Sequence, residues 1–172
     1  RNLCRTCVKI APSHANLLPI DPITPEYPFQ HICADFFMLD GHVYGVFVDR
    51  FTGWPGIFTG SSGDDVTTFL ARVSEKYGCP MTCTTDDGSN FVAENVKKFM
   101  KAYGIEHRIS SVANPHSNCR AELALKTVKR MLTENDGVSG KLDQAKVSRA
   151  LMQLRNTPDR DTGLSPAVAL MG

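Results

Sequence analysis

The sequence predicts an α/β fold built on a five-stranded mixed sheet that is flanked by helices. The first observation is a series of three apolar segments separated by tight-turn signals, at residues 30–39, 43–50 and 54–59. The second is an alternation of helical patterns and short apolar runs that continues to residue 109. The third is a set of amphipathic helical patterns in the rest of the chain. These patterns predict a sheet with helices layered against it.

Local turn chemistry supports each strand. Asp40-Gly41 and Thr52-Gly53 separate the first three apolar segments, and such pairs favour tight turns. The first three strands are therefore expected to pair as an antiparallel meander. A fourth strand is predicted over residues 81–85 and a fifth over 105–109, each after a helix.

The helices are indicated by apolar side chains that recur at three- and four-residue steps. The first is predicted over residues 63–78, with Asp64 or Asp65 as its cap and Gly78 as its stop. The second is predicted over 92–103. After a polar loop at 110–119, helices are expected from Arg120 onward, over 142–154, and after a Ser165 cap with Pro166 at the first position.

Composition is typical of one globular domain. The chain has 172 residues, of which 42% are hydrophobic, so it can bury a core of its own. No apolar run approaches the roughly 20 residues of a membrane-spanning helix, and no signal peptide is visible. The formal net charge of +1 neither requires nor excludes a nucleic acid partner. Since no initiator Met is present, we expect a fragment of a longer polyprotein.

The six cysteines favour buried thiols in a reducing compartment, the cytosol or nucleus, rather than disulfides. Two of them form the Cys4-Arg5-Thr6-Cys7 knuckle, which can supply two thiolates to a tetrahedral zinc. Two more ligands are needed, and His14 is the nearest candidate. A severed half-site without metal is the plainer interpretation. Four prolines between residues 12 and 25 and a fifth at 28 predict an extended linker before a domain that begins near Phe29.

Three acidic side chains stand out as catalytic candidates. Asp35 lies inside an apolar strand, where a carboxylate is expected only if it is paired with a buried arginine or hydroxyl or binds a cation. Asp86 ends the fourth strand, and Glu122 lies in the first turn of a helix. The step between them is 122 − 86 = 36, with 35 residues in between. Asp40 and Asp49 are assigned to turn or ion-pair chemistry instead.

Three carboxylates of this kind suit phosphodiester chemistry with metal ions. Two Mg²⁺ or Mn²⁺ ions about 3.5–4 Å apart activate the oxygen nucleophile and stabilise the leaving oxygen. Magnesium prefers hard oxygen ligands and keeps several waters, so few carboxylates suffice. We expect Asp35 to bridge the ions, with Asp86 on one and Glu122 on the other. No histidine base or serine nucleophile competes for the role.

Two lysines extend this candidate site along the helix. Lys126 and Lys129 follow Glu122 by four and seven residues, which puts all three on one helix face. Such a face suits a metal held beside a phosphodiester backbone. An ion-paired, solvated helix face is the alternative.

Ordered sequence blocks connect these residues to a known family. They are Ala34-Asp35-Phe36-Phe37, Val48-Asp49-Arg50-Phe51-Thr52-Gly53-Trp54, Thr85-Asp86-Asp87-Gly88-Ser89-Asn90-Phe91, Asn114-Pro115-His116-Ser117, Ala121-Glu122, and Asn156-Thr157-Pro158 with Ser165-Pro166-Ala167. With the carboxylate spacing, this order resembles the catalytic core of retroviral and retrotransposon integrases, the D,D-35-E polynucleotidyl transferases. Elements of the Gypsy type are the most similar. The resemblance covers nearly the whole chain.

The resemblance implies a ribonuclease-H-like fold and an enzyme that inserts retroelement DNA into target DNA. Water first trims the 3′ end of the element DNA, and the freed 3′ hydroxyl then attacks a target phosphodiester. The implied partners are double-stranded DNA and further copies of the chain, in a homodimer or higher oligomer, with no membrane. The implied location is the nucleus, after a cytoplasmic stage. Residues 1–28 would be the end of a zinc-binding domain plus linker, with two histidines upstream, and 29–172 the catalytic core.

The resemblance also implies DNA contacts. Ser89 and Asn90 match positions near target DNA. The loop positions that distort the element end are matched by Asn114, His116 and Asn118, and those that grip it by Lys126 and Lys129. Polar loop residues are also ordinary turn formers.

Two departures keep other functions open. Cys119 stands where the family usually has glycine, and Asp87 adds a negative charge beside Asp86. A host-captured, integrase-derived domain that binds DNA or protein with weak or no catalysis is the main alternative. A stand-alone nuclease such as a ribonuclease H is the other, and the carboxylate order disfavours it.

Overall fold

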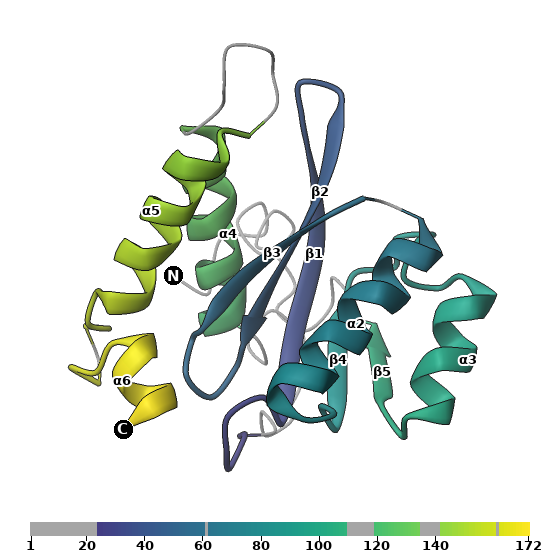
Figure 1. Ribbon diagram of the computed structural model, residues 1–172. Helices are drawn as coiled ribbons and strands as arrows, with labels where there is room; N and C mark the ends of the chain where they lie inside the picture. Colours follow the sequence, from purple (N-terminus) through teal and green to yellow (C-terminus); the bar gives the residue numbers. More distant parts are fainter. Residues whose placement is uncertain (1–23, 61, 110–118, 135–141, 161) are drawn as a thin grey trace, which may run out of the picture.

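The computed structural model describes residues 24–60, 62–109, 119–134, 142–160 and 162–172 (Figure 1). In the helix that starts at residue 119, the side chains are described from Ala124 onward. Within these ranges, no helix has the length and apolar character needed to cross a membrane.

A five-stranded mixed sheet forms the centre of the molecule. Its strands are β1 (His31–Leu39), β2 (His42–Asp49), β3 (Pro55–Thr59), β4 (Thr82–Thr85) and β5 (Glu106–Ile109), in the order β3-β2-β1-β4-β5. The first three strands pair antiparallel, as predicted, whereas β4 pairs parallel to both β1 and β5. β1 is therefore the middle strand, with a partner on each side.

The β1–β2 turn sets the register of this central pair. Asp40 and Gly41 both have positive φ, 45° and 78°, as a two-residue type I′ turn requires. The turn makes Leu39 the partner of His42, and the ladder runs from there to Ile32 and Asp49. The Asp40-Gly41 prediction is confirmed.

Helices cover both faces of the sheet. Figure 1 shows α2 (Gly63–Tyr77) and α3 (Glu94–Ala102) on one side, with α4 (Cys119–Thr133) and α5 (Gln144–Asn156) on the other. The short α6 (Pro166–Met171) closes the chain beside α5. Alternate residues of β1 face opposite layers: Ile32 and Ala34 join the α2–α3 core, and Cys33 joins the α4–α5 core.

The cap of α2 differs from the prediction. Ser62 is the N-cap, and its hydroxyl accepts a hydrogen bond from the Asp65 amide at 3.2 Å. The Asp65 carboxylate accepts one in return from the Ser62 amide at 2.9 Å. This reciprocal pair is a capping box with aspartate at its third helical position, so assigning the cap itself to Asp64 or Asp65 was wrong.

Other boundaries also shift. α3 begins at Glu94 rather than 92, because the Phe91 and Val92 amides both donate to the Gly88 carbonyl in a preceding turn. α5 runs from Gln144 to Asn156, with Asp143 as its cap. The Ser165 cap and first-position Pro166 of α6 are confirmed.

Two of the described cysteines are buried, as predicted. Cys33 is 1% exposed and Cys83 is fully buried, and burial raises the pKa of the Cys83 thiol. Cys79 is exposed, so the prediction of a buried thiol was wrong there. It lies in the short link between α2 and β4, which runs over the surface.

Candidate active site

Asp35 projects from the middle of the sheet toward the α4–α5 layer. It lies in β1 two residues after Cys33, so strand alternation puts both on the face that packs against α4. Its side chain is 30% exposed. The carboxylate is thus held by the central strand yet stays open to solvent.

Asp86 lies at the carboxyl end of the neighbouring strand. The parallel register pairs His31 with Thr82 and continues to Cys33 and Thr84, a constant offset of 82 − 31 = 51. The same offset takes position 35 to position 86, one residue beyond β4. Neighbouring strands lie about 4.8 Å apart, so we infer from this offset that the two aspartates lie near each other on the α4 side of the sheet.

Hydrogen bonds fix the backbone around Asp86. The Gly88 amide donates to its Oδ1 at 3.1 Å, and the hydroxyl of Thr85 donates to its carbonyl at 2.7 Å. The Thr85 hydroxyl also lies 2.8 Å from Nε2 of His107 on β5. Its only proton goes to Asp86, so Nε2 of His107 carries the hydrogen and donates. Burial, and then the nearby Lys97, lower the pKa of His107.

Sequence reasoning missed this role of His107 in supporting Asp86. The contact depends on the parallel pairing of β4 with β5, which places residues 22 positions apart side by side. A histidine in a short strand carries no signal of that partner.

Glu122 lies near the start of α4, and its side chain is outside the described residues. The helix packs against β1 and β2 through Leu125, Val128 and Leu132, all of which are buried. Among the described side chains, no three histidines, cysteines, aspartates or glutamates come together as a metal site. That set includes Asp35 and Asp86 but not Glu122.

Lys129 on α4 contacts Asp35 directly. Its ammonium forms an ion pair with Oδ2 of Asp35 and donates to the Phe36 carbonyl at 3.1 Å. The side chain of Lys129 is 27% exposed, whereas Lys126 is classed as exposed. Asp35 is therefore paired, with a lysine rather than the arginine or hydroxyl that the sequence suggested.

Asp49 has a structural role, and its assignment to turn chemistry is confirmed. The residue is fully buried at the end of β2. Its carboxylate accepts from the Phe29 and Thr52 amides at 2.9 Å each, and from the Thr52 hydroxyl at 2.6 Å. Asp40 lies in the β1–β2 turn and is exposed.

The remaining predicted site residues divide into two groups. Ser89 and Asn90 follow Asp86 in the link to α3, where Ser89 is exposed and Asn90 partly so. Asp87 is exposed as well. Outside the described residues lie the polar loop and the knuckle: Asn114, His116, Asn118, Cys4, Cys7 and His14.

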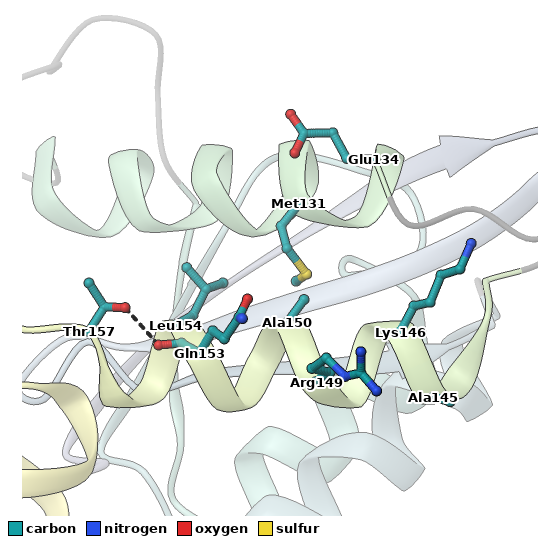
Figure 2. Close-up of a pocket in the computed structure, with 9 residues that line it drawn as sticks. All are labelled: Met131, Glu134, Ala145, Lys146, Arg149, Ala150, Gln153, Leu154 and Thr157. Carbon is teal, nitrogen blue, oxygen red and sulfur yellow. Dashed lines mark hydrogen bonds between the residues drawn. The ribbon is translucent and has the colours of Figure 1, made fainter.

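A separate groove lies between α4 and α5 (Figure 2). Its volume is about 460 Å³, and its lining includes apolar Met131 and Leu154 and basic Lys146 and Arg149. None of the predicted site residues lines it. The groove is thus distinct from the site at Asp35 and Asp86.

Comparisons with known proteins agree with this architecture. The family model described as "Integrase core domain" matches residues 25–115, which include Asp35 and Asp86. The chain is 31% identical over 161 residues to the uncharacterized protein K02A2.6 of Caenorhabditis elegans, covering 91% of this chain and 13% of that protein. It is 30% identical over 131 residues to the Gag-Pol polyprotein of woolly monkey sarcoma virus, covering 74% of this chain and 8% of the polyprotein. The chain thus spans a small part of these relatives.

A solved structure shows the same fold. It is the cryoEM structure of the simian T-cell lymphotropic virus intasome in complex with PP2A regulatory subunit B56 gamma. The TM-score is 0.68 at 17% identity, covering 83% of this chain and 55% of that chain. The mixed sheet with its covering helices is therefore the ribonuclease-H-like fold of integrase cores. From the match to its family model over residues 25–115, the chain belongs to the integrase core domain family.

Proposed function

We propose that this chain is the catalytic core of a retroelement integrase, which trims the 3′ end of element DNA and joins it to target DNA. One observation supports the proposal: β4 pairs parallel with β1 as far as Cys33 and Thr84, and α4, the helix of Glu122, packs against β1. The same offset carried two residues further would align Asp35 with Asp86. Three carboxylates from a strand, a strand end and a helix would then share one solvent-open edge.

The donor set fits divalent metal ions. Asp35 and Asp86 both offer hard carboxylate oxygens that reach solvent, as Mg²⁺ and Mn²⁺ prefer. A cationic group, the Lys129 ammonium, already lies against Asp35 and the Phe36 carbonyl. Asp35, Asp86 and Glu122 would hold two such ions. When bound, they would supply an activated oxygen nucleophile and neutralise charge on the phosphorus.

The chain's own residues hold the catalytic carboxylates in place and are not expected to transfer protons. Asp35 pairs with Val46 of β2, and β4 pairs with the preceding residues of β1 as far as Cys33, so the strand that carries Asp35 is anchored on both sides. Thr85 and His107 fix the carbonyl of Asp86, and Gly88 donates to its carboxylate. Such preorganisation keeps the carboxylates in one geometry without rearrangement during the reaction.

Double-stranded DNA is the proposed substrate, and the solved relative is an intasome. Target DNA would pass near Ser89 and Asn90, both outside the core. Element DNA would contact the helix face of Lys126 and Lys129, and the loop of Asn114, His116 and Asn118. We also propose assembly into a homodimer or higher oligomer, and action in the nucleus.

The N-terminal part of the proposal concerns residues 1–28. Cys4 and Cys7 would complete a zinc site only with two histidines that precede Arg1, and residues 12–28 would link it to the core at 29–172. Titration of zinc into a longer chain that includes those histidines tests this assignment.

A strand-transfer assay in Mn²⁺ tests the proposed activity. Asp35→Asn, Asp86→Asn and Glu122→Gln should each lower joining by at least about 100-fold, since metal ligation is worth several kcal/mol. Asp87→Asn is the matched control, because this exposed carboxylate adjoins Asp86 without a predicted ligand role. Circular dichroism verifies that each variant is folded.

Joining that survives all three substitutions would refute the assignment. DNA binding without turnover by the unmodified chain would instead support a captured binding domain. Cleavage of the RNA in a hybrid, without joining, would support a stand-alone nuclease.

A further inference from the structure

The ion pair between Lys129 and Asp35 joins a helix lysine to the strand carboxylate that the proposed function assigns to metal binding. Both partners are partly buried, at 27% and 30% exposure. The ammonium has a second oxygen partner, the Phe36 carbonyl at 3.1 Å. The lysine therefore lies in a small site with two oxygen ligands, and is not extended into solvent.

The packing of α4 against the sheet places Lys129 next to Asp35. Val128, the residue before Lys129, is 2% exposed within the core between α4 and the sheet. Lys129, the next residue, is partly buried, and its charged end reaches Asp35 and the Phe36 carbonyl of β1. Lys126 is exposed on the same helix one turn earlier, and offers a natural comparison.

A metal ion and the Lys129 ammonium would compete for Asp35. Both are cations, and both need oxygen from the same carboxylate. Two positive charges a few ångströms apart repel each other strongly at a partly buried site. Metal binding at Asp35 therefore favours departure of the ammonium.

We propose that Lys129 is a positioning residue that exchanges partners: it neutralises Asp35 in the metal-free chain and is released toward the DNA backbone when a divalent cation binds. This inference rests on the proposed function, because it takes Asp35 as a metal ligand. The exchange would couple metal loading to the availability of a phosphate-binding cation on α4. Until metal arrives, the same contact would keep the Asp35 side chain in one orientation.

The test is the affinity for Mn²⁺ of the chain of residues 1–172, measured by the electron paramagnetic resonance signal of free Mn²⁺. Lys129→Gln removes the competing charge and should tighten Mn²⁺ binding by about three- to tenfold. Lys129→Arg keeps a cation and should bind Mn²⁺ nearly as the unmodified chain does. Lys126→Gln should also leave the Mn²⁺ affinity unchanged, since its charge is exposed.

DNA binding provides a second measurement, in which Lys129→Gln should lower the affinity rather than raise it. Lys129→Gln should weaken binding of duplex DNA in Mn²⁺ and reduce its dependence on salt, because one phosphate contact is lost. If Lys129 had only a structural role, Lys129→Gln would lower the affinity for Mn²⁺ instead of raising it. Thermal melts monitored by circular dichroism confirm that the variants are folded.

The possible failures are distinguishable. If Asp35→Asn abolishes Mn²⁺ binding but Lys129→Gln leaves it equal or weaker, the exchange is wrong and the metal site stands. If the unmodified chain and Lys129→Gln both fail to bind Mn²⁺, the proposed metal site is wrong, and the exchange falls with it.

Discussion

Replacement of Asp49 should destabilise the fold without touching the candidate site. The carboxylate is fully buried and is the acceptor for the Phe29 and Thr52 amides, at 2.9 Å each, and for the Thr52 hydroxyl. In Asp49→Ala these donors lose their acceptor in a region closed to water. Each buried, unsatisfied donor costs about 1–3 kcal/mol. The hydroxyl can rotate, and the Phe51 amide, which also donates to Asp49, does so at a longer 3.3 Å. The Phe29 and Thr52 amides therefore dominate, and we expect a loss of about 3–5 kcal/mol.

Asp49→Asn tests how much of this loss comes from each side of the carboxylate. Asparagine keeps one oxygen, so it can serve either Phe29 or Thr52, and its NH₂ group faces donors. The expected loss is about 1.5–3 kcal/mol in free energy of unfolding. Asp40→Asn is the matched control and should change stability by less than about 0.5 kcal/mol, because asparagine tolerates the positive φ of this exposed turn.

Urea denaturation followed by circular dichroism measures these losses. For a chain of this size a loss of 3–5 kcal/mol corresponds to a fall in Tm on the order of 10 °C. Asp35→Asn, in contrast, should abolish joining with a much smaller change in stability, since its ion pair is partly exposed. If Asp49→Ala unfolded within about 1 kcal/mol of the unmodified chain, the reasoning on its hydrogen bonds would be refuted.

Three further predictions follow from single contacts. Gly45→Ala should lower the free energy of unfolding, measured by urea denaturation, by about 1–3 kcal/mol, because the new Cβ would lie 1.9 Å from the ring of Phe58. An unchanged free energy of unfolding would show that the ring accommodates the methyl group and would refute the prediction. Gly88→Ala should lower joining about tenfold with little effect on Tm, because its Cβ would lie 2.9 Å from Oδ1 of Asp86 and turn that carboxylate away; full activity would contradict it. Burial, then Arg50 and Arg108, lower the pKa of His31. The unfolded chain therefore binds more protons than the folded chain, so the stability present above about pH 6.5 is lost as the pH falls. His31→Gln should reduce the fall in Tm between about pH 7.5 and pH 5, and an unaltered pH dependence of Tm would count against this prediction.

The sequence sufficed for those features that depend on local chemistry. Asp40-Gly41 specified the turn between β1 and β2, because aspartate and glycine accept positive φ. Ser165-Pro166 specified the start of α6, because a hydroxyl cap and proline suit a first helical turn. The apolar run around Asp35 predicted a strand there, and the structure confirms it as β1, in which Asp35 pairs with Val46 of β2.

Features that depend on distant packing were not predictable. The ion pair of Lys129 with Asp35 joins residues 94 positions apart, so it requires the packing of α4 on β1. The support of Asp86 by His107 requires the parallel pairing of β4 with β5. The cap of α2 was misassigned for a subtler reason: Ser62, Asp64 and Asp65 are all good capping residues, and the reciprocal bond selects Ser62.

The most direct test is a crystal of this chain soaked in Mn²⁺, with the anomalous signal locating the metal. We predict Mn²⁺ within coordination distance of both Asp35 and Asp86, with the Lys129 ammonium moved off Asp35. A soaked crystal in which the Lys129–Asp35 pair persists, with no metal between the two aspartates, would contradict the account.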